Sequence, residues 1–140
     1  MPELVYAVVT DAPVNIAELS KLVTNPHSGA VVTFCGDVRN HDGGKEVASL
    51  LYEIHPSAPE QLRLITQALI SQFDIKKVAV AHRFGDIAIG ETAFAVAVSA
   101  AHRQAAFDAC SAIVDEVKAK LPIWKHQKFT DGSDEWVNCA

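Results

Sequence analysis

Hydrophobic and polar positions follow two periods along this chain, one typical of strands and one typical of helices. Runs rich in β-branched and aromatic residues, bounded by turn residues, predict strands. These runs lie at residues 4–10, 29–38, 47–54, 76–83, 91–99, 123–129 and 135–137. Because adjacent strands are mixed with strand–helix units, the order predicts an α+β fold with a mixed or mainly antiparallel sheet packed by helices.

Apolar residues at helical spacing predict three helices between these strands. The first covers residues 14–23 and ends before an Asn-Pro pair. The second begins at Ser57, which we expect to form a capping box with Glu60, and its apolar face continues to Phe73. The third, for which Ser99 is the expected cap, ends before a proline and carries the clearest buried stripe. That stripe consists of Ala106, Ala109, Cys110, Ile113, Val114, Val117 and Leu121.

Polar and glycine-bearing segments separate several of these elements. Residues 39–45 (RNHDGGK) predict a loop, residues 84–90 a loop or bulge, and residues 130–133 the turn of a hairpin. The strand at 29–38 is so apolar that we expect it to be buried on both faces.

The composition is that of a folded protein, and we treat residues 1–140 as one domain. Apolar residues make up 49% of the chain and charged residues 21%, which excludes a wholly disordered chain. A formal net charge of −5 without a basic run argues against nucleic-acid binding through general phosphate attraction. The chain lacks an apolar stretch long enough for a membrane span, and its start does not resemble a secretory signal. We therefore expect no membrane association and a cytoplasmic location.

Cysteine and histidine usage gives little sign of a metal or redox centre. Cys35, Cys110 and Cys139 are odd in number and widely spaced, which argues against a disulfide framework and a cysteine zinc site. We expect Cys35 and Cys110 to be small core residues and Cys139 to be exposed. The GxGxxG, P-loop, GxSxG and HExxH motifs are absent and the histidines are scattered, so we expect no metal and no cofactor.

Cations at element boundaries are the strongest candidates for chemistry. Arg39 directly follows a predicted buried strand, and His102 and Arg103 stand in the first turn of the third helix. The free N–H groups and positive potential of a helix N-terminus suit an anionic ligand. A structural alternative is equally good, in which Arg103 pairs with a carboxylate and His102 caps the turn. For Arg83, we favour an ion pair with Asp86 in the turn that follows.

Two lysines near the end of the third helix are further candidates. Lys118 follows Val117 and therefore lies at the edge of the buried stripe, and Lys125 follows Trp124 at a strand start. A lysine beside apolar surface can lose solvation, which lowers its pKa toward a useful range. The residues alone favour the simpler alternative, in which the stems are buried and the ammonium groups stay in water.

Three segments together resemble the large, catalytic subunit of molybdopterin synthase. They are GAVVTFCGDVRNHDGG, AHRFGDIAIGE and VSAAHRQAAFDACSAIVDEVKAKLPIWKHQ, and the resemblance covers residues 29–137. The resemblance implies an α/β hammerhead fold with an additional small antiparallel sheet, and a homodimer within a heterotetramer. It also implies a sulfurtransferase that converts cyclic pyranopterin monophosphate to molybdopterin. The sulfur would come from the C-terminal thiocarboxylate of a small ubiquitin-like subunit.

The resemblance also implies roles for individual residues. Lys118 matches the essential lysine near the incoming thiocarboxylate, and Lys125 matches a second active-site lysine. Arg39, His102 and Arg103 match a pocket for the anionic substrate, to which residues can be contributed across the dimer. The family often continues past the Trp-Val near the end with further basic residues, whose contribution we expect to be absent or supplied elsewhere. Two alternatives are a non-catalytic module that binds a ubiquitin-like tail or an anionic metabolite, and a ferredoxin-like small-ligand sensor.

Overall fold

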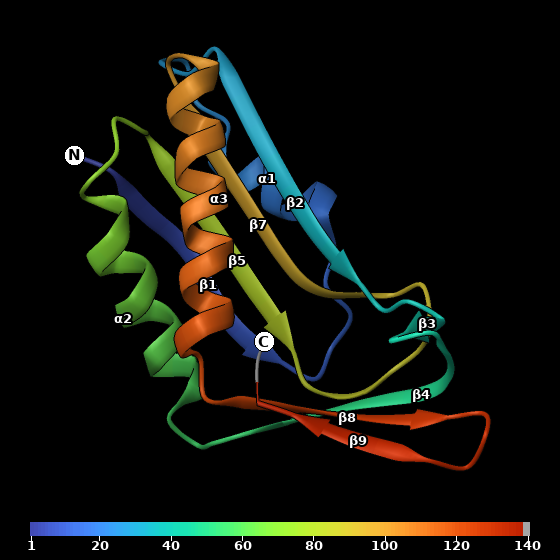
Figure 1. The fold of residues 1–140 in the computed structure, drawn as a ribbon. Helices are drawn as coiled ribbons and strands as arrows, with labels where there is room; N and C mark the ends of the chain where they lie inside the picture. The colour runs from blue at the N-terminus through green and yellow to red at the C-terminus, as the bar shows by residue number, and fades with distance from the viewer. Residues whose placement is uncertain (139–140) are drawn as a thin grey trace.

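Four strands form a mixed sheet in this computed structural model, which describes residues 1–138. Its strands are β1 (Glu3–Thr10), β5 (Lys77–Arg83), β7 (Thr92–Ala100) and β2 (Ala30–Asp37), in the order β1-β5-β7-β2. β1 pairs with β5 in parallel, and the other two pairs are antiparallel. The predicted α+β class with a mixed sheet is therefore confirmed (Figure 1).

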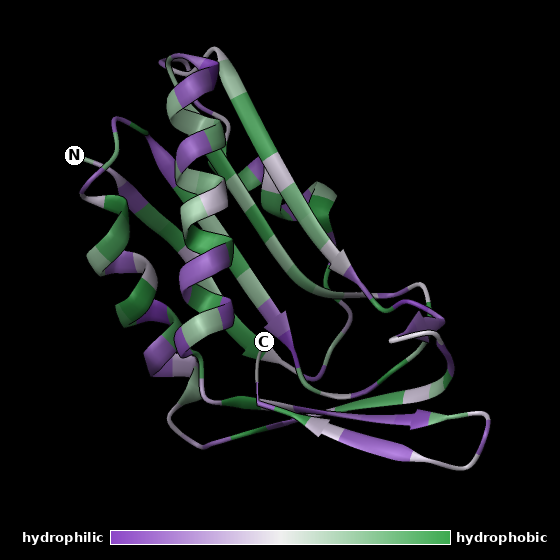
Figure 2. Cartoon of the chain, in the orientation of Figure 1, coloured by the Kyte–Doolittle hydropathy of each residue, from purple (hydrophilic) through white to green (hydrophobic). Residues whose placement is uncertain are grey.

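Side chains alternate between the two faces of this sheet, and each face is covered by helices. The valines of β5 and β7 face α2 (Ala58–Ile70) and α3 (Arg103–Lys120), which pack in front of the sheet (Figure 1). The alanines of the same strands face α1 (Ile16–Val23), where their small side chains let the short helix approach closely. Figure 2 colours most of β5 and β7 as hydrophobic.

The edge strand β2 differs from the prediction of two buried faces. Its burial alternates, and Val31, Thr33 and Cys35 are exposed. Val32 and Phe34 pack against the core beneath α3, but α1 is too short to cover the opposite face of β2 as well as β5 and β7. The expected core position of Cys35 is therefore wrong, whereas Cys110 is buried as expected. Cys139 lies outside the described residues.

A second, antiparallel sheet lies across the lower end of the first (Figure 1). Its order is β3 (His41–Asp42), β4 (Lys45–Ile54), β8 (Ile123–Phe129) and β9 (Asp134–Val137), and β6 (Gly85–Ile87) also pairs with β4. The segments predicted as loops at 39–45 and 84–90 thus contain the short strands β3 and β6. Gly43 and Gly44 have positive φ angles of 56° and 80°, and they form the tight turn between β3 and β4.

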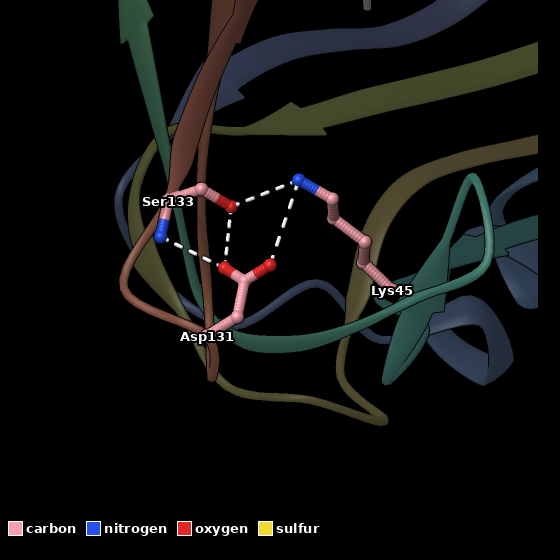
Figure 3. Close-up of polar contacts among 3 residues, drawn as sticks. All are labelled: Lys45, Asp131 and Ser133. Carbon is pink, nitrogen blue, oxygen red and sulfur yellow. Dashed lines mark hydrogen bonds and ion pairs between the residues drawn. The ribbon is translucent and has the colours of Figure 1, made fainter.

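A polar contact fixes the β8–β9 turn to the start of β4 (Figure 3). Lys45 Nζ donates to Ser133 Oγ at 3.0 Å and lies 3.5 Å from an Asp131 carboxylate oxygen. The backbone N–H of Ser133 donates to the same carboxylate at 2.8 Å. The Lys45 ammonium also lies 5.2 Å from the centre of the Phe129 ring. These contacts hold the predicted hairpin, which is confirmed, against β4.

The helix starts differ from the predicted caps. Asn15 caps α1 by accepting from Ala17 N at 2.9 Å. Ser57 precedes α2, but its hydroxyl bonds His55 Nδ1, and Glu60 pairs with Arg63 instead of closing a capping box. Ser99 lies within β7, and the residue before α3 is His102. Among the described residues, the helices are too short or too polar to cross a membrane.

Candidate functional site

The connection between α3 and β8 brings Lys118 and Lys125 to the same end of the molecule. Lys118 is in the last turn of α3, and β8 begins three residues after the helix ends. Leu121 and Ile123 anchor this connection in the core with exposures of 3% and 0%. Pro122 O accepts from His55 N at 3.1 Å, which ties the connection to the segment after β4. The connection is therefore short and fixed at both ends.

The strand β8 presents alternate residues to the molecular interior. Ile123, Gln127 and Phe129 are buried, and Lys125 shares their face of the strand. His126 lies on the opposite face, where it stacks on Trp136 at 4.2 Å and contacts Asp134 at 2.8 Å. Lys125 therefore faces the space between the two sheets, and His126 does not.

A buried aromatic cluster joins the two lysines. Tyr52 of β4 is the cross-strand partner of Lys125, and its ring lies 5.1 Å from the His82 ring in an edge-on arrangement. His82, at the end of β5, also stacks on Phe94 at 5.2 Å. The charge of Lys118 helps to lower the pKa of His82, so this ammonium lies near the cluster. Lys118 thus lies near His82, and Lys125 is the cross-strand partner of Tyr52.

His82 is the most deeply buried titratable residue of this cluster, with 0% exposure. Its Nδ1 lies 2.8 Å from Arg83 O, so Nδ1 carries the proton and donates. Burial lowers the pKa of the imidazole to about 4, and Lys118 acts in the same direction. The ring is therefore neutral at pH 7.

Arg39 is linked to the site by its contact with the Asp42 carboxylate. Its guanidinium lies 3.6 Å from one oxygen of Asp42, and the buried Gln127 amide donates to the other oxygen at 2.6 Å. The hydrogen bond from Gln127 lowers the pKa of Asp42, and the charges of Lys125 and Arg39 also act in this direction. The side chain of Arg39 is 63% exposed, so it remains available to a ligand.

His102 and Arg103 lie at the opposite end of α3. At roughly 1.5 Å per residue, Arg103 is about 22 Å from Lys118 along the helix. His102 is the N-cap residue without a side-chain capping bond, so the alternative in which its side chain caps the turn is wrong. Both side chains are exposed, and within residues 1–138 Arg103 forms no ion pair. The structure therefore links Arg39 to Lys125 through Asp42, and Lys118 to Lys125 through the His82–Tyr52 ring pair. His102 and Arg103 of the same chain lie apart from them.

Four residues of the site were not selected from the sequence: Tyr52, His82, Asp42 and Gln127. Gln127 is buried at an inward position of β8. A polar residue at an inward position of a predicted strand was the sequence feature that could have indicated it. His82 was passed over together with Arg83, whose predicted partner is also corrected. Arg83 pairs with Glu91 at 3.5 Å instead of with Asp86.

The arrangement is suited to binding an anion and to transferring protons. The charges of Lys125 and Arg39 act on the Asp42 carboxylate, and Lys118 adds a third positive charge near His82, so the site carries excess positive charge. Within residues 1–138, no cluster of three or more His, Cys, Asp or Glu side chains is arranged to hold a metal ion. A groove of about 260 Å³ lies between β1 and α2, and none of the predicted site residues lines it.

Comparison with known proteins gives one consistent result. The family model described as MoaE protein matches residues 9–120. The molybdopterin synthase catalytic subunit of Arabidopsis thaliana is 42% identical over 120 residues, which are 85% of this chain and 61% of the relative. Molybdopterin synthase catalytic subunit 1 of Mycobacterium tuberculosis is 38% identical over 136 residues, which are 94% of this chain and 90% of the relative. The crystal structure titled molybdopterin synthase from Staphylococcus aureus superposes with a TM-score of 0.86 at 28% identity, covering 94% of this chain and 96% of that one.

Proposed function

The chain belongs to the MoaE protein family, and from this membership we propose that it is the catalytic subunit of a molybdopterin synthase. In this role it transfers sulfur to cyclic pyranopterin monophosphate and yields the dithiolene of molybdopterin. The observation that carries the proposal is the setting of Lys118 and Lys125 at the Tyr52–His82 ring pair, with Arg39 linked to Lys125 through Asp42. A lysine with only a solvated surface role is not expected beside a buried pair of rings.

The residues take distinct parts in this reaction. Each transfer moves sulfur from the small subunit's thiocarboxylate to a substrate carbon and leaves a carboxylate, whose oxygen comes from the substrate or from water. Lys118 and Lys125 stabilise the negative charge that develops and exchange protons with the reacting groups. Arg39 binds the substrate phosphate, because guanidinium groups form strong charge-assisted hydrogen bonds with phosphate oxygens.

We propose further that a second copy of the chain supplies His102 and Arg103. The separation of about 22 Å along α3 keeps these residues away from Lys118 of the same chain. Both side chains are exposed at the helix N-terminus, where free N–H groups also favour an anion. In a symmetric dimer each copy contributes His102 and Arg103 to the site of the other copy, so two equivalent sites result.

The other parts of the proposal concern partner, location and organisation. A small ubiquitin-like subunit with a thiocarboxylated C-terminus is the partner that supplies sulfur. A cytoplasmic location agrees with Cys35 and Cys110, which are free thiols, as expected in a reducing compartment. The chain acts as one domain, because residues of both sheets contribute to the larger of its two hydrophobic clusters.

A single-turnover assay tests the activity. The full chain is mixed with thiocarboxylated small subunit and cyclic pyranopterin monophosphate, and the product is identified by mass. We expect Lys118→Ala to lower the rate at least about 100-fold, as for loss of a proton-transferring group. The matched control is Lys120→Ala, since Lys120 is 62% exposed and pairs with Glu116. Equal loss in both variants contradicts the assigned role of Lys118, and binding of the small subunit without product favours a non-catalytic module.

Mixing two inactive variants tests the shared site. Lys118→Ala and Arg103→Ala are each purified, mixed, unfolded and refolded together. If one site draws Lys118 and Arg103 from different copies, mixed dimers contain one intact site, and about one quarter of the wild-type activity returns. No recovery, with mixed dimers present by mass spectrometry, contradicts a site built from two copies.

A further inference from the structure

His82 lies in a place where packing alone favours an apolar residue. The two preceding inward residues of β5 are Val78 and Val80, both with 0% exposure. The His82 ring has the same exposure and is covered by Tyr52 and Phe94. Burying an imidazole is costly unless its polar atoms are paired, and a third valine or a phenylalanine avoids that cost. The histidine therefore calls for an explanation other than core filling.

The hydrogen bonds of the ring leave one nitrogen without a partner. Nδ1 donates to Arg83 O, so Nε2 carries no proton and is an acceptor. Within residues 1–138, Nε2 is buried and has no hydrogen-bond partner. Nε2 is the ring nitrogen farther from the backbone and therefore points away from β5, on the sheet face where α3 packs. A buried acceptor without a donor is rare in proteins and marks a site that a ligand or a movement completes.

The neighbours of this nitrogen belong to the proposed transfer site. Tyr52, in ring contact with His82, is the cross-strand partner of Lys125. Lys118 is the charged group that acts on the imidazole, and the ring is kept neutral. A neutral ring leaves the Lys118 ammonium free of repulsion, which a protonated imidazole at this place would impose.

We propose that His82 is a positioning residue of the transfer site, whose ring orients Tyr52 beside Lys125 and whose Nε2 accepts a hydrogen bond from a donor in the loaded site. The inference rests on the proposed function and extends it to a residue that touches neither the substrate phosphate nor the solvent. His82 acts through Tyr52 and the lysines, and it takes no proton during the reaction.

Two substitutions distinguish the contribution of the aromatic ring from that of Nε2. His82→Phe keeps an aromatic ring between Tyr52 and Phe94 but removes Nε2, and His82→Gln keeps a polar acceptor near the place of Nε2. Val80→Ala is the matched control, because it weakens the same face of the same strand without touching a polar atom. The full chain is assayed with thiocarboxylated small subunit, and kcat, KM and the melting temperature are measured for each variant.

We expect His82→Phe to fold, to keep KM within about twofold and to lower kcat at least about tenfold, as for an interaction used in the transition state. His82→Gln is expected to recover part of the lost kcat. Val80→Ala is expected to lower the melting temperature and leave kcat within about twofold of wild type. A wild-type kcat in His82→Phe overturns the inference, and so does a His82→Gln variant that is no faster than His82→Phe.

Nitrogen NMR of the histidine-labelled chain tests the inference without turnover. We expect the Nε2 signal of His82 to be that of an unprotonated nitrogen at neutral pH, and to shift when thiocarboxylated small subunit and cyclic pyranopterin monophosphate are added together. A protonated Nε2, or a signal that does not shift on their joint addition, overturns the positioning role. If the wild-type chain transfers no sulfur, the proposed function fails on that assay alone.

Discussion

Acid destabilisation through His82 is the prediction that the structure defines most closely. The folded-state pKa of this imidazole is lowered to about 4, chiefly by burial, whereas an imidazole in the unfolded chain titrates near 6.5. The unfolded state therefore binds more protons than the folded state between these two values. Stability supplied by the neutral ring is complete above about pH 6.5 and is lost as the pH falls toward 4.

The magnitude follows from the two pKa values. One pKa unit corresponds to about 1.4 kcal/mol, so the full loss below pH 4 is about 3 kcal/mol. Lowering the pH from about 7.5 to about 5 removes about 2 kcal/mol of this, because most of the interval between the pKa values has then been crossed. His82→Phe lacks the imidazole and therefore shows none of this pH-dependent loss of stability. The lost hydrogen bond to Arg83 O costs it about 1 kcal/mol at every pH.

Urea unfolding of wild type and His82→Phe at several pH values measures the difference. Asp42 and the other carboxylates titrate in both proteins, so their contributions cancel when the two pH profiles are subtracted. We expect the wild-type free energy of unfolding to fall more steeply between about pH 7.5 and pH 5, by about 2 kcal/mol. Parallel profiles refute the reasoning, because they require that His82 titrates alike in the folded and unfolded states.

Three further predictions concern other parts of the chain. Arg39→Ala is expected to weaken binding of cyclic pyranopterin monophosphate, measured by calorimetry, and the difference from wild type should shrink as salt is added, because the exposed guanidinium is screened. Asn15→Ala removes the cap of α1 and should lower the urea-derived stability by about 1 kcal/mol; an unchanged midpoint argues against the cap. In a Cys139→Ser background, a thiol reagent should label the exposed Cys35 before Cys110, because burial raises the pKa of the Cys110 thiol to about 11. Equal labelling rates contradict this order.

The elements of the core could be predicted because their patterns are long. The stripe of α3 and the apolar runs of β5 and β7 extend over several turns or strand residues, and local rules then suffice. The burial of β2 could not be predicted in the same way. Its composition is as apolar as that of β5, and its exposure depends on its place at the sheet edge and on the short reach of α1.

The caps were predicted wrongly because hydroxyl groups have competing partners. Ser57 bonds the neighbouring His55 ring, and the Ser99 hydroxyl accepts from Lys77 N and from the Asn25 amide across the sheet. Such partners are brought close only by tertiary structure. A capping pattern in sequence gives the chemistry that is available, but not the acceptor or donor that is nearest after folding.

In the candidate site, too, some residues are placed by local contacts and others by tertiary contacts. Lys118 and Lys125 are seven residues apart, and what places them together is a short connection with little freedom. Leu121 ends the helix by donating its N–H to Val117 O at 2.9 Å, and Ile123 then enters the core. A lysine one residue past a buried helix position and a lysine two residues past a buried strand start must therefore emerge at one corner of the fold.

Tyr52 and His82 reach that corner by another route, through the pairing of β4 with β8 and the stacking of the two sheets. Their positions depend on contacts between residues far apart in the chain, which no local pattern encodes. The corner thus combines two cations fixed by one tight connection with two rings fixed by the packing of separate sheets. A change in the angle between the sheets moves Tyr52 and Lys125 relative to His82 and Lys118, so the fold itself determines the geometry in which the cations act.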